Sequence, residues 1–247
     1  MKYIFNFFLF TYFSFISLAI TSDTESNAKL FGSLPDVSNV KISPNGKFVG
    51  VQQRTEETIV VKIIDLDNAQ LLSVHNFGSK GQITDFFWAT DKRLVFTVAR
   101  ENSRNTEIYN VGQLVAANID GKRTKLIAGF GSAPDSRQGV RNRDRTNPDR
   151  PAIIVHRLPK DSNKILVSFF DNAGFNELAE LDINNGKVSY VTTSPVIYPN
   201  WIFNNEGKLM GVSSSTLENN SEIFLFKPNL PQGSLSSRQC GQKQNCY

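Results

Sequence analysis

The chain has 247 residues, of which 40% are hydrophobic and 20% charged, a globular composition that excludes a disordered or collagen-like protein. Two histidines and two cysteines leave few ligands for a structural zinc site or a disulfide scaffold, so we expect no metal and no cofactor. The net charge of +4 is concentrated in an Arg-rich stretch, residues 137–150, and in the tail, without interleaved aromatic residues. This distribution argues against a nucleic-acid partner.

The first 19 residues have the pattern of a secretory signal peptide. Lys2 precedes an uncharged apolar run of 18 residues, and Ser17 and Ala19 supply the small residues that a signal peptidase reads. An uncleaved N-terminal anchor is the alternative, because a run of this length is just sufficient to span a bilayer. We favour cleavage after Ala19, which predicts a periplasmic or secreted protein with a flexible linker at residues 20–30 and no membrane span after cleavage.

A turn flanked by two apolar strands recurs four times along the chain. Each turn is rich in Pro, Asn, Asp or Gly and is closed by a basic residue, namely Lys47, Arg93, Lys164 and Lys208. The intervals between these residues are 46, 71 and 44 residues, and residues 131–152 carry no strand pattern and form an insertion of 22 residues in the long interval. The period is therefore about 45 residues, which is near the spacing of four-stranded propeller blades.

A second turn within the repeats indicates two hairpins per unit. Acidic, amide and small residues suited to a tight hairpin occur at 65–70, 117–122 and 181–187. The intervening runs are β-branched and aromatic, and they lack the spacing of amphipathic helices. We therefore predict an all-β protein, a β-propeller of about four blades over residues 31–228 that belongs to a larger, incomplete ring.

The last blade is expected to be short. Its strand pattern ends near Phe226, and residues 229–247 read as an irregular tail. An open ring would expose apolar side chains such as Phe224 and Phe226, and unpaired strand edges, so self-association is expected. In the tail, Cys240 and Cys246 are compatible with a short disulfide loop or with two free thiols.

At these turns the sequence resembles the N-terminal propeller of prolyl oligopeptidase-family serine peptidases, the dipeptidyl-peptidase and acylaminoacyl-peptidase-like enzymes. The matching words are Leu34-Pro35, the segment Ile42–Lys47, Trp88-Ala89, and Asp182-Ile183 followed by Gly186-Lys187. TolB-like periplasmic propellers use similar turns. The resemblance implies a propeller that restricts the access of peptides to a serine site on a separate α/β-hydrolase domain.

The chain departs from that family at the catalytic residues. No serine lies in a Gly-x-Ser-x-Gly pentapeptide, because the glycines around Ser79 and Ser132 have the wrong spacing. We interpret His75 and His156 as strand residues and Asp65 and Asp67 as hairpin residues rather than a calcium pair. Four aromatic residues that could line a pocket are read instead as packing between blades, namely Phe86, Phe87, Trp88 and Trp201. No catalytic, cofactor-binding or metal residue is assigned.

Two hypotheses of function follow. The first is a non-catalytic, exported propeller fragment of a prolyl oligopeptidase-family protein, truncated before the hydrolase domain. The alternative is a complete TolB-like module that binds another exported protein. A peptidase with an unrecognised site is the least favoured, and in each case the expected partner is a peptide or a protein.

Overall fold

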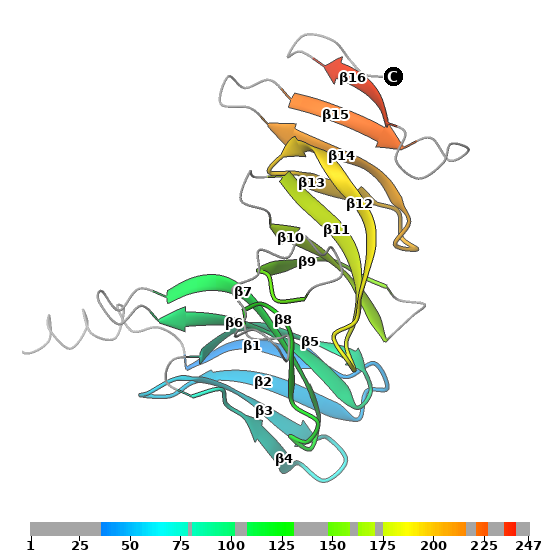
Figure 1. Cartoon of the computed structure of the whole chain (residues 1–247). Helices are drawn as coiled ribbons and strands as arrows, with labels where there is room; N and C mark the ends of the chain where they lie inside the picture. The colour runs from blue at the N-terminus through cyan, green and yellow to red at the C-terminus, as the bar shows by residue number, and fades with distance from the viewer. Residues whose placement is uncertain are drawn as a thin grey trace, which may run out of the picture. The chain divides into compact units, whose positions relative to one another are not determined.

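The computed structural model describes residues 36–78, 81–101, 108–130, 148–158, 163–170, 175–215, 221–226 and 235–240 (Figure 1). The expected signal peptide, the linker and most of the Arg-rich stretch lie outside these residues. The described residues contain β-strands and turns and no helix, and none of them forms a helix that could cross a membrane. The expected all-β class is confirmed.

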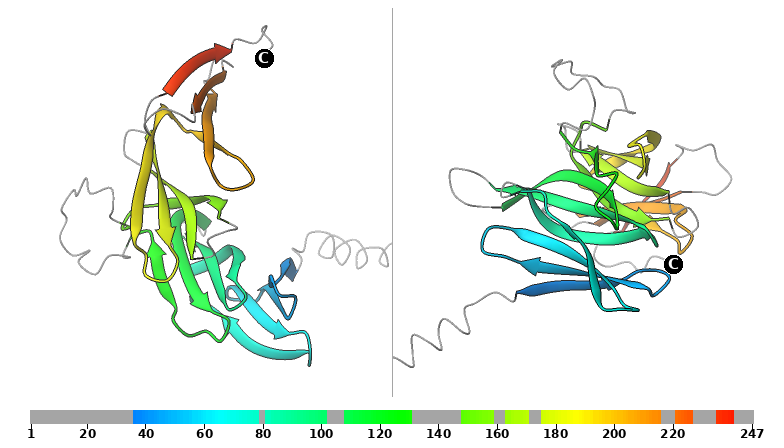
Figure 2. Two further views of the ribbon diagram at one scale, coloured as in Figure 1. Left: turned by 90° about the vertical axis from the view of Figure 1, so that its right-hand side faces the viewer. Right: turned by 90° about the horizontal axis from the view of Figure 1, so that it is seen from below.

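In the described part of the chain, sixteen strands form four antiparallel sheets, each a meander of four consecutive strands (Figures 1 and 2). The first sheet contains β1 (Val37–Ile42), β2 (Phe48–Arg54), β3 (Ile59–Asp65) and β4 (Gln70–His75). The second contains β5 (Gly81–Thr90), β6 (Arg93–Glu101), β7 (Ile108–Asn118) and β8 (Lys125–Ala128). The third contains β9 (Ala152–Arg157), β10 (Lys164–Phe170), β11 (Phe175–Asp182) and β12 (Val188–Ile197). The fourth contains β13 (Asn200–Phe203), β14 (Leu209–Ser215), β15 (Ser221–Phe226) and β16 (Leu235–Cys240).

The predicted turns lie where the repeat places them. The four turns closed by a basic residue connect the first and second strands of each sheet, and the three further turns connect the third and fourth strands. In the first turn, Ser43 accepts a backbone hydrogen bond from Gly46, whose φ of +72° is the left-handed conformation that glycine adopts without strain. The four-stranded unit of a propeller blade is thereby confirmed.

Two boundaries predicted from the sequence differ from those in the structure. β16 lies in the segment expected to be irregular, and it pairs with β15 in register from Ser221 opposite Cys240 to Phe226 opposite Leu235. The expectation that the last sheet ends near Phe226 was therefore wrong. β9 begins at Ala152, so the insertion is also shorter by one residue than the pattern indicated.

Buried apolar side chains join consecutive sheets. One cluster between the first and second sheets includes Val61, Ile63, Phe86 and Phe96. A second cluster joins the second and third sheets and includes Phe87, Leu114, Val167 and Phe169. A third joins the third and fourth sheets through Leu166, Leu178, Trp201 and Val212. Each inner sheet thus buries both faces against its neighbours, the arrangement expected of stacked blades.

The strand β5 separates the first two clusters. Successive side chains of a strand point to opposite faces, so Phe86 faces the first sheet while Phe87 faces the third. Their exposed fractions are 1% and 3%. Gly50 on β2 permits the close approach of Phe86, because a Cβ at Gly50 would lie 2.5 Å from Cε2 of the phenylalanine ring.

Polar side chains add bonds between sheets. Trp88 on β5 donates its indole N–H to the carbonyl of Lys41 on β1 at 2.9 Å, and Trp201 on β13 donates to the Ser168 hydroxyl on β10 at 3.0 Å. Buried Arg93 on β6 donates from Nε and Nη2 to the carbonyl of Ile183, which follows β11, at 3.2 and 2.9 Å. The basic residue that closes the second predicted turn therefore links the second sheet to the third.

The face of the first sheet that points away from the second sheet carries exposed apolar side chains around Lys62 of β3. Val40 and Ile42 lie on this face, opposite Val51 and Val49 in the register of β1 and β2, and are 56% and 62% exposed. Val74 lies on the same face of β4 and is also exposed. We call these residues the free face. It fits the expectation that an outer sheet exposes apolar side chains, although the side chains of Phe224 and Phe226 lie outside the description.

Candidate functional site

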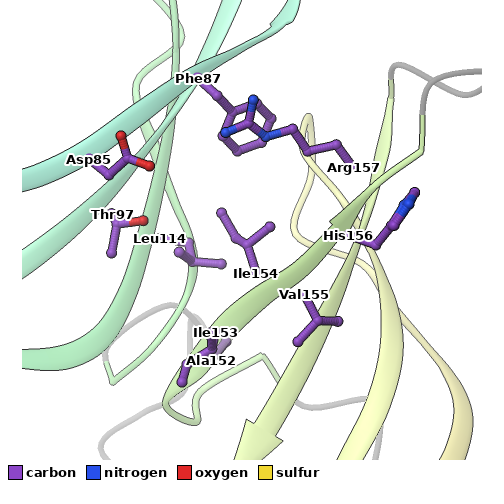
Figure 3. A pocket seen from close by; sticks show the side chains of 10 residues that line it. All are labelled: Asp85, Phe87, Thr97, Leu114, Ala152, Ile153, Ile154, Val155, His156 and Arg157. Atoms are coloured by element: carbon purple, nitrogen blue, oxygen red, sulfur yellow. The ribbon is translucent and has the colours of Figure 1, made fainter. Parts of the chain in front are cut away.

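The junction between the second and third sheets opens into a cleft of about 510 Å³ (Figure 3). One wall comes from the second sheet, with Asp85 and Phe87 on β5, Thr97 on β6 and Leu114 on β7. The opposite wall is the whole of β9, residues Ala152–Arg157. A volume of this size lies in the range of small-ligand pockets in proteins.

An irregularity in β9 decides which of its side chains reach the cleft. Val167 pairs with Ile154 and Leu166 pairs with His156, so Val155 is an extra residue without a partner on β10. Such a bulge places neighbouring side chains on one face and re-aims those that follow. Val155 and His156 accordingly share the face toward the fourth sheet, where Val155 packs against the third cluster, whereas Ile154 packs against the cluster between the second and third sheets.

The two residues after the bulge also point in opposite directions. Figure 3 shows the Arg157 side chain extending toward Phe87 and the His156 ring turned away from the cleft. His156 lies instead against Phe203 of the fourth sheet, with ring centroids 5.1 Å apart. The bulge therefore places the Arg157 guanidinium in the cleft and turns the ring of His156, which also borders the cleft, toward the fourth sheet.

Arg157 rests on an aromatic surface. The centre of its guanidinium lies 4.2 Å from the centroid of the Phe87 ring, a cation–π arrangement that contributes about 0.5–1 kcal/mol at an exposed site. Within the described part of the chain, the guanidinium has no hydrogen-bond acceptor and no carboxylate oxygen within 4 Å. Its planar edge of N–H donors is therefore available to a ligand.

Asp85 on the other wall is already partnered. One carboxylate oxygen, Oδ1, accepts hydrogen bonds from Lys41 Nζ at 2.6 Å and from Asn39 Nδ2 at 3.0 Å, and both donors lie on β1. The positive charge of Lys41 balances the negative charge of Asp85, whose side chain is 49% exposed. Among the described residues that line it, the cleft thus combines apolar side chains with an acid that is paired, Asp85, and a cation that is not, Arg157.

His75 is the other histidine considered in the sequence. It ends β4 and is buried against Phe96, with ring centroids 4.9 Å apart. Burial lowers its pKa to about 4, although the charge of Asp120 acts in the opposite direction. The ring is therefore neutral at pH 7 and a weak base.

Ser73 and Asp120 both lie near His75, so the three residue types of a serine-hydrolase triad occur together there. Ser73 Oγ lies 3.4 Å from His75 Nε2, and Asp120 is close enough to influence the ring. The serine hydroxyl, however, donates its proton to the carbonyl of Ile119 rather than to the imidazole. A serine nucleophile requires an exposed hydroxyl whose proton a histidine can accept, and this arrangement lacks that feature.

The other residues singled out from the sequence have structural contacts. Phe86, Phe87, Trp88 and Trp201 all pack between sheets, as expected, although Phe87 also borders the cleft. Asp65 is a hairpin residue, since its Oδ1 accepts the backbone N–H of Asp67 at 2.9 Å. Sequence reasoning missed Arg157 and Asp85, because neither residue lies in a motif that indicates a binding site.

Comparisons with known proteins agree on the fold. A family model described as lactonase, 7-bladed β-propeller, matches residues 14–117, which is less than half of the chain. No curated protein matches. Among solved structures, one from a structural and mechanistic analysis of two prolyl endopeptidases matches at 11% identity with a TM-score of 0.50. The match covers 84% of this chain and 29% of that chain.

Two further structures give similar values. The β-propeller domain of the Trilobed protease from Pyrococcus furiosus matches at 13% identity with a TM-score of 0.48, covering 82% of this chain and 56% of that chain. TolB from Acinetobacter baumannii matches at 17% identity with a TM-score of 0.41, covering 78% and 41%. The chain therefore spans less than two thirds of the length of each of these structures, and the match to the prolyl endopeptidase structure is a likeness of fold alone, that of a β-propeller.

Proposed function

We propose that this chain is a non-catalytic, exported propeller that binds peptide segments in the cleft between its second and third sheets. The observation that carries the proposal is the cleft itself, which presents apolar side chains and polar groups side by side. A peptide needs both kinds of contact, because its side chains are partly apolar and its backbone carries hydrogen-bonding groups.

The proposal serves both hypotheses drawn from the sequence. In a prolyl oligopeptidase-like protein, a cleft of this kind would bind peptides before they reach a catalytic domain. In a TolB-like module it would hold a segment of a partner protein. Both require that peptides bind between β5 and β9, so one measurement tests what they share.

The binding test uses the purified chain and a pool of fluorescein-labelled random 12-residue peptides, observed by fluorescence polarisation. Ile154→Glu places a charge in the apolar wall, and we expect it to weaken binding at least ten-fold. Ile202→Glu, a substitution of the same kind on the fourth sheet, is the matched control and should bind like the parent protein. Absence of binding, or equal binding by Ile154→Glu, would refute the proposal.

The absence of catalysis is tested separately. A serine hydrolase reacts covalently with a fluorophosphonate, and we expect neither labelling of this chain nor hydrolysis of peptide or ester substrates. Hydrolysis that a fluorophosphonate abolishes would overturn the non-catalytic part of the proposal and leave the binding part intact.

Export is tested by N-terminal sequencing of the protein recovered outside the cytoplasm. Cleavage after Ala19 would give a mature N-terminus at Ile20. An intact Met1 recovered from the membrane fraction would replace secretion with anchoring.

A further inference from the structure

The positive charge of Arg157 in the cleft indicates which chemical group of a ligand can lie next to it. The Arg157 side chain is exposed, and the centre of its guanidinium lies 4.2 Å from the centroid of the Phe87 ring, so the ring helps to hold the guanidinium in the cleft. A guanidinium held in this way presents two parallel N–H donors at its edge, which match the two oxygens of a carboxylate. The ligand group next to Arg157 should therefore be a planar anion.

The surroundings of Arg157 indicate what the anion is attached to. Leu114, Ala152 and Ile154 supply apolar side chains to the same cleft, with Ile154 three residues before Arg157 on β9. A ligand that satisfies both the cation and this wall carries its negative charge next to an apolar group. The C-terminal residue of a peptide has this combination, because its carboxylate and its side chain leave the same α-carbon.

Asp85 provides a contact for the rest of the peptide. Lys41 and Asn39 both donate to Oδ1, and within the described residues no donor is bonded to Oδ2. This second oxygen is an acceptor on the wall opposite Arg157, and it suits a backbone N–H of the ligand. The two walls thus offer an acceptor for an amide and a donor for a carboxylate.

We propose that Arg157 is the carboxylate anchor of the cleft and that its ligand is the free C-terminus of a peptide that ends in an apolar residue. This inference rests on the proposed peptide-binding function and makes it more specific. A charge-assisted pair of hydrogen bonds would make a free carboxylate bind about 10- to 100-fold more tightly than the corresponding amide.

The test compares two forms of one probe, fluorescein-Gly-Ser-Gly-Ala-Leu with a free carboxylate and the same peptide with a C-terminal amide. In the parent protein the carboxylate form should bind more tightly by the factor given above. Arg157→Gln should bind both forms equally. Arg157→Lys should retain part of the preference, because it keeps the charge but loses the planar, stacked donor pair.

Arg54→Gln is the matched control, since it removes the same charge from an exposed position on β2. It should keep the full preference of the parent protein. A thermal melt of each variant shows whether it is folded, and the exposure of Arg157 makes its replacement compatible with folding. The preference should also decrease at high salt, because the interaction is electrostatic.

The outcomes separate this inference from the function on which it rests. If both probes bind equally and Ile154→Glu abolishes that binding, the cleft binds peptides and the carboxylate anchor is wrong. If the preference exists but survives Arg157→Gln, another residue is the anchor and the assignment fails. If neither probe nor the random peptide pool binds, the peptide-binding function itself fails.

Discussion

The two faces of the second sheet are packed differently, although both are lined by large apolar side chains. Toward the first sheet, Trp88 and Asp85 on β5 both bond to Lys41 on β1. Toward the third sheet, Arg93 links β6 to the end of β11, but within the described residues no side-chain hydrogen bond joins β5 to β9. The difference indicates that a cleft can form where apolar packing continues but side-chain hydrogen bonds do not join the first strands of neighbouring blades.

The largest expected effect comes from comparing adjacent phenylalanines on β5. Phe86→Ala should lower the free energy of unfolding by about 3–5 kcal/mol, because it leaves a cavity in the junction with the first sheet. Phe87→Ala should cost less, because its ring borders a cleft that is already open. Urea unfolding of both variants measures the difference. An equal loss of unfolding free energy in the two variants would mean that Phe87 contributes as much to packing as Phe86, despite the cleft beside it.

Arg93 tests the link between the second and third sheets. Burial lowers the pKa of its guanidinium, as does the positive charge of Arg123, while Asp182 acts in the opposite direction. Arg93→Met should lower the free energy of unfolding by about 2–4 kcal/mol, because the carbonyl of Ile183 loses both of its guanidinium donors. The exposed neighbour Lys92 provides the control, and Lys92→Met should change stability by no more than about 0.5 kcal/mol. Similar losses in both variants would contradict a structural role for the link.

His75 tests the junction with the first sheet through pH. Its pKa is about 4 in the folded protein and about 6.5 in the unfolded chain. Between these values the unfolded chain binds a proton that the folded protein does not, so stability is full above pH 6.5 and falls as the pH falls toward 4. The expected loss from this residue reaches about 3 kcal/mol. Urea unfolding at several pH values should show a steeper decline in the parent protein than in His75→Gln, and parallel curves would refute this account.

The free face of the first sheet has the smallest expected effect on folding. Ile42→Glu lies on an exposed surface and should change the free energy of unfolding by about 0.5 kcal/mol or less. If a second copy of the chain covers this face, the same substitution should decrease self-association, because it places a charge in an apolar contact. Light scattering of the parent protein and the variant provides the measurement. A parent protein that is monomeric would remove the reason to propose this contact.

The sequence predicts the repeating unit well because turns are encoded locally. Asn45-Gly46, Asp120-Gly121 and Asn185-Gly186 each supply a residue suited to a positive φ, and each lies in a hairpin of the structure. The basic residues that close the turns could be predicted from the sequence for the same reason. Fold class and blade spacing follow from these short segments without knowledge of how the sheets pack.

β16 was missed because its residues lack the pattern of a half-buried strand. The segment Leu-Ser-Ser-Arg-Gln-Cys has no alternation of apolar and polar residues over its length. It becomes a strand by pairing with β15, which supplies backbone partners that a local pattern does not reveal. A terminal strand of a meander is therefore harder to recognise than the strands before it.

The cleft was missed because its residues are distant in sequence. Asp85 and Arg157 are separated by 72 positions and approach only when the second and third sheets stack. The bulge at Val155 decides that Arg157 rather than His156 faces the cleft, and its position depends on pairing with β10. Sheet stacking and strand register, which no single segment encodes, determine this site.

The meander order of each sheet also has a consequence for synthesis on the ribosome. Because every strand pairs only with its neighbours along the chain, the first sheet can form once His75 has emerged, before any other sheet exists. The next 53 residues, which complete the second sheet at Ala128, take roughly 3–10 s to translate. During that interval both faces of the first sheet lack a partner, and a chaperone that binds apolar β-surface on the nascent chain would find its earliest target there.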